Sequence, residues 1–188
     1  TLADAREPLA VEALVGRLGI VDRTQLQALA KRLKAMVRDG QLLQNRVGEY
    51  CLLERLPLVV GTVSGHRDGF GFLVPDGEGD DLFLPYREMR QVMHGDRVAA
   101  RVTGRDERGR SEGAIAEVLE RRTRQVAGLL TLESGLGFVV PDNRRISQRV
   151  VVPREATGPA RHGDLAVVEI TEQPSRNRDA VGRVLRVL

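Results

Sequence analysis

The chain has 188 residues, of which 41% are hydrophobic and 29% charged, and its net charge is +3. This length allows one large domain or two to three small ones, and no apolar run approaches the roughly 18 residues of a membrane helix, so we expect no membrane partner. The single cysteine, Cys51, excludes an internal disulfide and a cysteine zinc cluster. The polar start lacks a signal-peptide pattern, and together these features favour a cytoplasmic protein.

The basic residues are unusual in kind, because all of them except Lys31 and Lys34 are arginines. Arginine stacks on nucleobases and binds phosphate with two parallel donors. A GC-rich genome would produce the same bias, so composition alone does not decide between these explanations.

The first 55 residues predict a small α+β domain. Segment 8–18 favours a short helix, and Leu26, Leu29, Leu33 and Met36 follow helical spacing over 25–38 until Asp39-Gly40 ends the pattern. Two short segments, 41–44 and 49–53, flank a turn that contains Gly48 and indicate a β-hairpin. Helices followed by a hairpin are typical of a winged helix-turn-helix, which we predict over 1–55.

The longer predicted helix carries a basic stripe. Lys31, Lys34 and Arg38 lie at i, i+3 and i+7, opposite the apolar face. Such a stripe either keeps a helix soluble or, in a winged helix, contacts the phosphates of a nucleic-acid duplex. The sequence leaves both readings open.

The rest of the chain contains a duplication. The segment GFGFLVPD at 69–76 returns as GLGFVVPD at 135–142, LFLP at 82–85 as VVVP at 150–153, and HGD at 94–96 as HGD at 162–164. The offsets are 66, 68 and 68 residues, and landmarks in one order at nearly one spacing indicate a repeated domain. We therefore predict two further domains, 56–122 and 123–188.

Each copy predicts five short strands separated by loops rich in Gly, Asp, Glu and Arg. They are 58–64, 70–75, 81–85, 96–103 and 111–119 in the first copy, and 125–132, 137–141, 149–153, 164–171 and 179–187 in the second. Five strands in about 65 residues fit a small closed or partly open barrel. The predicted fold class is mainly β, with two tandem barrels behind the small α+β domain.

Three of the four phenylalanines lie in the first copy. Side chains alternate along a strand, so Phe70 and Phe72 share one face, and Phe83 joins them if Leu82 and Leu84 point into the core. Exposed rings suit single-stranded bases, whose stacking contributes roughly 1–3 kcal/mol each. The flanking candidates for nucleic-acid binding are His66, Arg67 and Tyr86. The alternatives are that one ring points inward or that a neighbouring domain covers the patch.

The second copy keeps Phe138 but has Leu136 and Val151 in place of two rings, so we expect it to bind bases weakly. It would hold the nucleic-acid backbone instead, unless its arginines only form a solvated loop; these candidates are Arg144, Arg145 and Arg149. The repeated His-Gly-Asp segments predict structural turns rather than catalysis, since glycine and aspartate favour turns and no serine or cysteine stands at matched spacing in both copies.

The sequence DGFGFLVPD…DDLFLP resembles the paired ribonucleoprotein-type motifs of cold-shock domains, OB-fold barrels that bind single strands, although Asp68 and Pro85 depart from the usual residues. A winged helix, a cold-shock domain and a degenerate cold-shock domain, in that order, resemble the amino-terminal half of the bacterial ribonuclease R family. The stretches MVRDGQLLQNRVGEYCL and VMHGDRVAARV carry this resemblance. Ribonuclease II shares the two barrels but generally lacks the helix-turn-helix, and is second choice.

The resemblance implies that the parent protein is a magnesium-dependent 3′→5′ exoribonuclease, with its metal ligands in a catalytic domain that these 188 residues do not include. We therefore expect no catalytic residue and no cofactor in this chain. The implied partners are single-stranded RNA, structured or duplex RNA through the winged helix, and the downstream catalytic domain. The alternatives are a freestanding nucleic-acid chaperone or regulator, and a protein-interaction module whose aromatic patch is covered.

Overall fold

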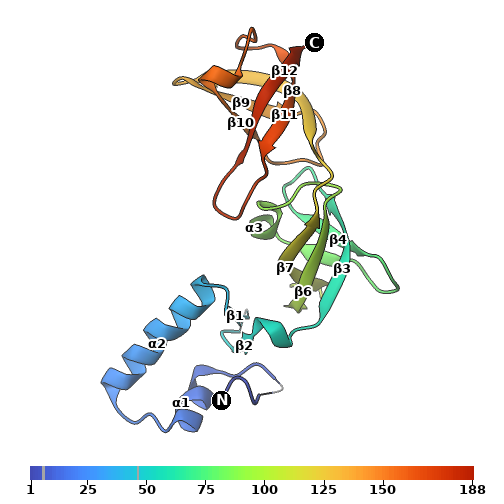
Figure 1. The fold of residues 1–188 in the computed structure, drawn as a ribbon. Helices are drawn as coiled ribbons and strands as arrows, with labels where there is room; N and C mark the ends of the chain where they lie inside the picture. Colours follow the sequence, from blue (N-terminus) through green and yellow to red (C-terminus); the bar gives the residue numbers. More distant parts are fainter. Residues whose placement is uncertain (6, 46) are drawn as a thin grey trace. The chain divides into compact units, whose positions relative to one another are not determined.

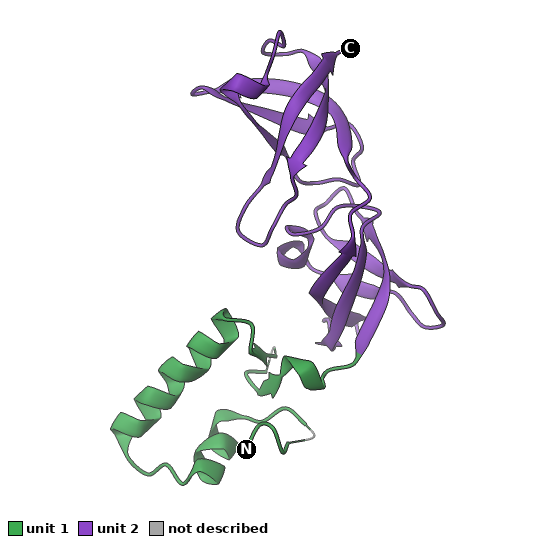
Figure 2. Cartoon of the chain, in the orientation of Figure 1, with its two compact units in different colours: residues 1–57 green, residues 58–188 purple. Residues whose placement is uncertain are grey.

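The computed structural model describes residues 1–5, 7–45 and 47–188. The chain divides into two compact units, Thr1–Pro57 and Leu58–Leu188 (Figure 2). Both predicted barrels belong to the second unit, so the predicted boundary at residue 122 stays a prediction. Among the described residues, none of the helices combines the length and the apolar composition that a membrane-spanning helix needs.

The first unit contains two helices, a hairpin and a 3₁₀ turn: α1 (Val11–Leu18), α2 (Arg23–Arg38), β1 (Leu42–Gln44), β2 (Tyr50–Leu52) and Leu53–Arg55. Helix α1 ends at Gly19, whose φ of 65° lies in the left-handed region that favours glycine. One residue of each helix and one of each strand form the buried core, which comprises Leu14, Leu33, Leu42 and Tyr50. The predicted helices and hairpin are present.

The first barrel is built from five strands and a one-turn helix: β3 (Leu58–Gly65), β4 (Gly71–Pro75), β5 (Leu82–Leu84), α3 (Tyr86–Met89), β6 (Arg97–Arg105) and β7 (Ser111–Glu120). The strands close in the order β3-β4-β5-β7-β6, and β5 and β7 are parallel neighbours. Figure 1 labels β3, β4, β6 and β7 of this barrel. Closure leaves no open sheet edge. The predicted strand 81–85 is shorter because the chain turns into α3 after Pro85.

The second barrel repeats this topology with β8 (Gln125–Glu133), β9 (Leu136–Pro141), β10 (Val150–Pro153), a 3₁₀ turn (Arg154–Ala156), β11 (Leu165–Glu172) and β12 (Ala180–Val187). Its strands close in the order β10-β12-β11-β8-β9. Each barrel has its own apolar core. The predicted fold class, mainly β with two five-stranded OB barrels and helices near the start of the chain, is confirmed.

The segments 94–96 and 162–164 form equivalent turns. The glycine of each has φ near 90°, a conformation that glycine adopts without steric cost. Each histidine accepts a backbone N–H through Nδ1, from Gly65 at 3.2 Å in the first barrel and from Leu132 at 3.0 Å in the second. The aspartates accept backbone N–H groups within their own turns. The repeated motif therefore shapes the barrels.

Candidate nucleic-acid interface

The three phenylalanines of the first barrel form one aromatic cluster (Phe70, Phe72 and Phe83). Phe72 and Phe83 are paired in register across β4 and β5, and the three ring centroids lie 5.7–5.9 Å apart. All three rings are half-buried, whereas Leu73 and Leu84 on the opposite faces are 0% exposed. The alternation of the strands thus puts leucine in the core and phenylalanine on the outer face of the barrel.

Two predicted neighbours lie beside the aromatic cluster. The imidazole of His66 stacks on Phe70 with centroids 4.3 Å apart and planes 10° apart. Tyr86 is 65% exposed, and its ring lies against Gly69, where an added Cβ would be 2.8 Å from the tyrosine Cδ2. Arg67 is exposed in the turn that joins β3 and β4. The turn after β3 therefore brings His66 to the rings and the start of α3 brings Tyr86 next to Gly69, whereas the Nε of Arg67 lies 3.8 Å from Oδ1 of Asp68.

Sequence reasoning missed a further neighbour, Arg110. Its Cζ lies 4.4 Å from the ring centroid of Phe83 and 5.6 Å from that of Phe72. The parallel pairing of Phe83 with Glu112 across β5 and β7 brings this distant segment to the rings. The signal that could have found it is the closure of the barrel, which makes the third and fifth strands neighbours.

Asp106 holds the loop that carries Arg110. Its Oδ1 accepts the backbone N–H groups of Arg108 at 2.9 Å and of Arg110 at 2.8 Å, and its Oδ2 accepts Nε of Arg110 at 2.7 Å. Burial raises the pKa of Asp106, but the hydrogen bonds from Arg110 and Arg108 outweigh it and lower the pKa below its ordinary value. The carboxyl group is therefore ionised at neutral pH.

The second barrel offers a smaller surface of the same kind. The guanidinium of Arg149 lies 4.4 Å above the ring of Phe138, and its Nε lies 3.2 Å from Oδ2 of Asp179. Leu136, which replaces a ring of the first copy, is 43% exposed. Of the three predicted arginines, Arg149 is thus the one that contacts an aromatic ring.

Arg144 and Arg145 are exposed in the loop that joins β9 and β10. This loop packs against the first barrel, because a Cβ added at Gly65 would lie 2.0 Å from the carbonyl oxygen of Arg145. Burial, followed by the positive charge of Arg145, lowers the pKa of His94. The predicted arginine pair therefore lies partly at the seam between the barrels.

Hydrogen bonds cross this seam. The side-chain amide of Gln148 donates to the carbonyl oxygens of Met89 and Val92 at the end of α3. The guanidinium of Arg121 donates to the carbonyl oxygen of Pro174 at 3.2 Å and also binds a carboxylate of the first barrel. These contacts join the two barrels into one compact unit.

A groove of about 380 Å³ follows the seam. Tyr86 and Arg90 from the first barrel line one side, and Ser147, Arg149 and Asp179 from the second barrel line the other. Tyr86 also lies against Gly69, the residue before Phe70, and Arg149 also covers Phe138. The groove therefore connects the aromatic surfaces of the two barrels.

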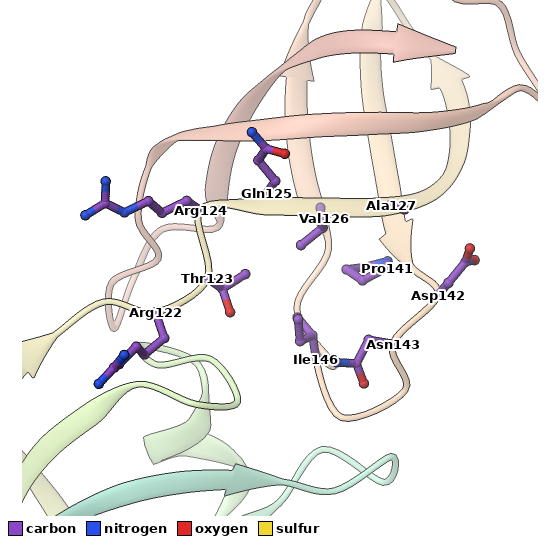
Figure 3. Close-up of a pocket in the computed structure, with 10 residues that line it drawn as sticks. All are labelled: Arg122, Thr123, Arg124, Gln125, Val126, Ala127, Pro141, Asp142, Asn143 and Ile146. Carbon is purple, nitrogen blue, oxygen red and sulfur yellow. The ribbon is translucent and has the colours of Figure 1, made fainter. Parts of the chain in front are cut away.

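A second hollow, of about 520 Å³, lies between the segments Arg122–Ala127 and Pro141–Ile146 (Figure 3). In Figure 3, Ile146 and Asn143 lie close together on the loop that faces the strand with Val126. Among the described residues that line it, none was predicted as a binding residue.

The predicted basic stripe is exposed on α2, since Lys31, Lys34 and Arg38 all face solvent while Leu33 is buried. The Nε of Arg38 donates to Oδ1 of the adjacent Asp39 at 3.0 Å. Lys31 and Lys34, unlike Arg38, have no acidic residue next to them in the sequence.

Acidification should destabilise the fold through His94. In the folded state the pKa of His94 is lowered from its ordinary value of 6.5. As the pH falls below 6.5, the unfolded chain therefore takes up a proton at His94 before the folded chain does. The free energy of unfolding should therefore fall from pH 6.5 through the lowered pKa of His94. Urea unfolding at a series of pH values measures this slope.

The matched control is His94→Asn, which keeps an acceptor for the N–H of Gly65 but does not titrate. The variant should lose part of the pH dependence, because the substituted side chain takes up no proton in this pH range. An identical slope in the two proteins would contradict the prediction.

The magnesium implied by the family resemblance finds no ligand set in the part of the chain that the structure describes, where no group of three or more His, Cys, Asp and Glu side chains could hold a metal ion. The buried acids Glu88, Asp96 and Glu112 instead serve structural bonds or ion pairs; for example, Glu88 accepts the backbone N–H of Ile115 at 2.8 Å.

Two family models match the barrels: the ribonuclease B OB domain over residues 61–118 and the cold shock domain over residues 138–188. Ribonuclease R of Escherichia coli strain K12 is 44% identical over 187 residues, which cover 100% of this chain and 23% of that protein. Ribonuclease R of Acidithiobacillus ferrooxidans is 45% identical over 184 residues, which cover 96% of this chain and 42% of that protein. The chain thus spans less than half the length of these relatives.

Solved structures share the fold at low identity. Mycoplasma genitalium RNase R in complex with ribose methylated single-stranded RNA matches with a TM-score of 0.59 and 18% identity over 69% of this chain and 21% of that one. The yeast pseudonuclease Ssd1 matches with a TM-score of 0.57 and 15% identity over 82% of this chain and 24% of that one. With relatives at more than 40% identity along its whole length and both barrels matched by the corresponding domain models, the chain belongs to the ribonuclease R family and corresponds to its amino-terminal region.

Proposed function

We propose that this chain is the RNA-binding region of a 3′→5′ exoribonuclease of the ribonuclease R type. It captures single-stranded RNA by base stacking and passes the strand to a catalytic domain outside these residues. The observation that carries the proposal is the aromatic cluster, which lies half-buried on the outside of a barrel whose own core is complete without it. Exposed rings that the core does not need are suited to stacking on unpaired bases, whatever their sequence.

The path of the strand follows from the surfaces that adjoin the aromatic cluster. A strand stacked there lies next to Tyr86, from which the groove leads past Arg90 to Arg149. The two guanidinium groups can bind phosphate, while the second barrel offers Phe138 as a ring already covered by Arg149. The first barrel therefore supplies most of the stacking, and the second guides the backbone.

The first unit supplies a second mode of contact. The exposed side chains of Lys31, Lys34 and Arg38 on α2 form a basic face, which in a winged helix meets duplex phosphates. We propose that this face engages structured or duplex RNA. The enzyme is cytoplasmic in this proposal.

Magnesium belongs to the catalytic domain of the proposed enzyme, where it would stabilise the charge that develops on the transferred phosphoryl group. The purified chain should therefore bind a labelled single-stranded RNA without shortening it when magnesium is present. Gel electrophoresis of the RNA after incubation tests this expectation. Progressive loss of nucleotides from the 3′ end, in proportion to the amount of chain, would show that the catalytic site is here.

Salt dependence separates the proposal from a protein-interaction module. If Arg90, Arg149 and other basic side chains bind phosphates, the logarithm of the affinity should fall linearly with the logarithm of the salt concentration. The slope should be about 0.7 per phosphate contact for a single strand. An apolar surface that docks a protein would show no such dependence. Competition between RNA and DNA strands then distinguishes the exoribonuclease region from a freestanding DNA-binding regulator.

A further inference from the structure

We propose that Arg110, positioned by Asp106, is an additional RNA-binding residue that clamps a nucleobase against Phe83 and Phe72. The inference deepens the proposed function, since it assigns a binding site for one base within the aromatic cluster. It rests on the geometry of the loop between β6 and β7.

The guanidinium of Arg110 already occupies the aromatic cluster. Its Cζ is 4.4 Å from the centroid of Phe83 and 5.6 Å from that of Phe72, within the roughly 6 Å over which a cation is attracted to a ring face. Its side chain is 37% exposed, so solvent, and therefore a ligand, reaches it. His66 covers Phe70 in a comparable way at 4.3 Å. Two of the three rings thus carry a planar polar group of the protein where a base would stack.

Asp106 fixes Arg110 at this place. The Asp106 side chain is only 6% exposed, and its two oxygens bind the backbone N–H of Arg108, the backbone N–H of Arg110 and Nε of Arg110 at 2.7–2.9 Å. One carboxylate therefore shapes the loop and holds the arginine side chain. The ion pair uses the Nε donor, and a guanidinium has four further N–H donors on its two terminal nitrogens.

A base that stacks on Phe83 must take the place of Arg110, because a separation of 4.4 Å leaves no layer between the guanidinium and the ring. The tether to Asp106 keeps the displaced side chain next to the base. The planar guanidinium then stacks on the free face of the base, and its terminal nitrogens reach the adjoining phosphate. Phe83, the base and Arg110 form three layers.

The position of Asp106 gives the proposal a sharp electrostatic test. A carboxylate beside a polyanion repels it, so charge alone predicts that removing the charge of Asp106 strengthens RNA binding. The clamp predicts the opposite sign, because without the carboxylate Arg110 is no longer held over the rings. The direction of the change therefore decides between the two explanations.

The experiment measures the anisotropy of a labelled oligouridine bound to the full chain at several salt concentrations. Arg110→Ala should weaken binding about three- to tenfold and lower the salt slope by about 0.7, the value for one phosphate contact on a single strand. Asp106→Asn should also weaken binding, although the protein gains net positive charge. Asp81→Asn, which removes the same charge at an exposed position directly before β5, should leave the affinity unchanged or raise it.

Arg110→Lys keeps the charge and removes the planar group, so it should lose most of the affinity that the alanine variant loses. Full affinity in Arg110→Lys, or binding by Asp106→Asn as tight as that of the unaltered chain, would overturn the clamp. If these variants bind normally while loss of Phe70 and Phe83 abolishes binding, only the clamp fails. If the unaltered chain binds no RNA, the proposed function itself fails.

Discussion

Phe70→Leu combined with Phe83→Val should weaken the binding of single-stranded RNA by at least about 25-fold. Each stacked base contributes roughly 1–3 kcal/mol, and 1.4 kcal/mol corresponds to a factor of ten. The variant loses the two rings that lie 5.7 Å apart in the aromatic cluster and keeps only Phe72. Anisotropy titration with a labelled single strand measures the dissociation constant.

The substitutions are those that the protein itself carries in its second barrel, at Leu136 and Val151. That barrel closes with the same strand order as the first, so the double variant should keep its fold and its unfolding temperature. The reverse change, Leu136→Phe with Val151→Phe, should create a second stacking surface next to Phe138 and strengthen binding. A folded Phe70→Leu, Phe83→Val variant that binds RNA as tightly as the unaltered chain would contradict base stacking at the aromatic cluster.

The barrels were predictable because their strands follow simple local rules. The alternation of Phe72 and Leu73 shows which face is buried, and the repeat of 69–76 at 135–142 shows that the same unit occurs twice. The predicted ends of these ten strands lie within two residues of the ends of β3 to β12 in the structure. Two closed five-stranded barrels follow from this pattern.

The surroundings of the aromatic cluster were only partly predictable. His66 and Tyr86 are close to the rings along the chain, and sequence proximity was enough to find them. Arg110 lies 27 residues after Phe83 and reaches it through the parallel pairing of β5 and β7. That pairing depends on how the barrel closes, which no local pattern encodes.

The seam between the barrels was not predictable either. Gln148 reads in the sequence as an ordinary polar loop residue, yet it donates to two carbonyl oxygens of the first barrel. Leu26 shows the converse error in the first unit, because it follows the apolar spacing of α2 but is 39% exposed. Helical spacing gives the face on which a side chain lies but not how far the neighbouring elements cover that face.

Gly61→Ala should destabilise the first barrel by about 3 kcal/mol. A Cβ at Gly61 would lie 2.1 Å from the carbonyl oxygen of Val74, on the neighbouring strand β4. Gly128 repeats this close approach in the second barrel, where a Cβ would lie 2.0 Å from the carbonyl oxygen of Val140. Because both obstacles are backbone atoms of a paired strand, relief requires the two strands to move apart. The urea midpoint of unfolding measures the effect.

The matched control is Gly77→Ala in the loop after β4. An added Cβ at Gly77 meets no atom within 4 Å, and Gly77 does not have the left-handed backbone conformation that favours glycine. This variant should unfold at the same urea concentration as the unaltered chain or slightly above it. Gly61→Ala should also weaken RNA binding, because β3 pairs with β4 and sets the position of Phe72. A Gly61→Ala variant with an unchanged midpoint would show that β3 and β4 do not approach this closely.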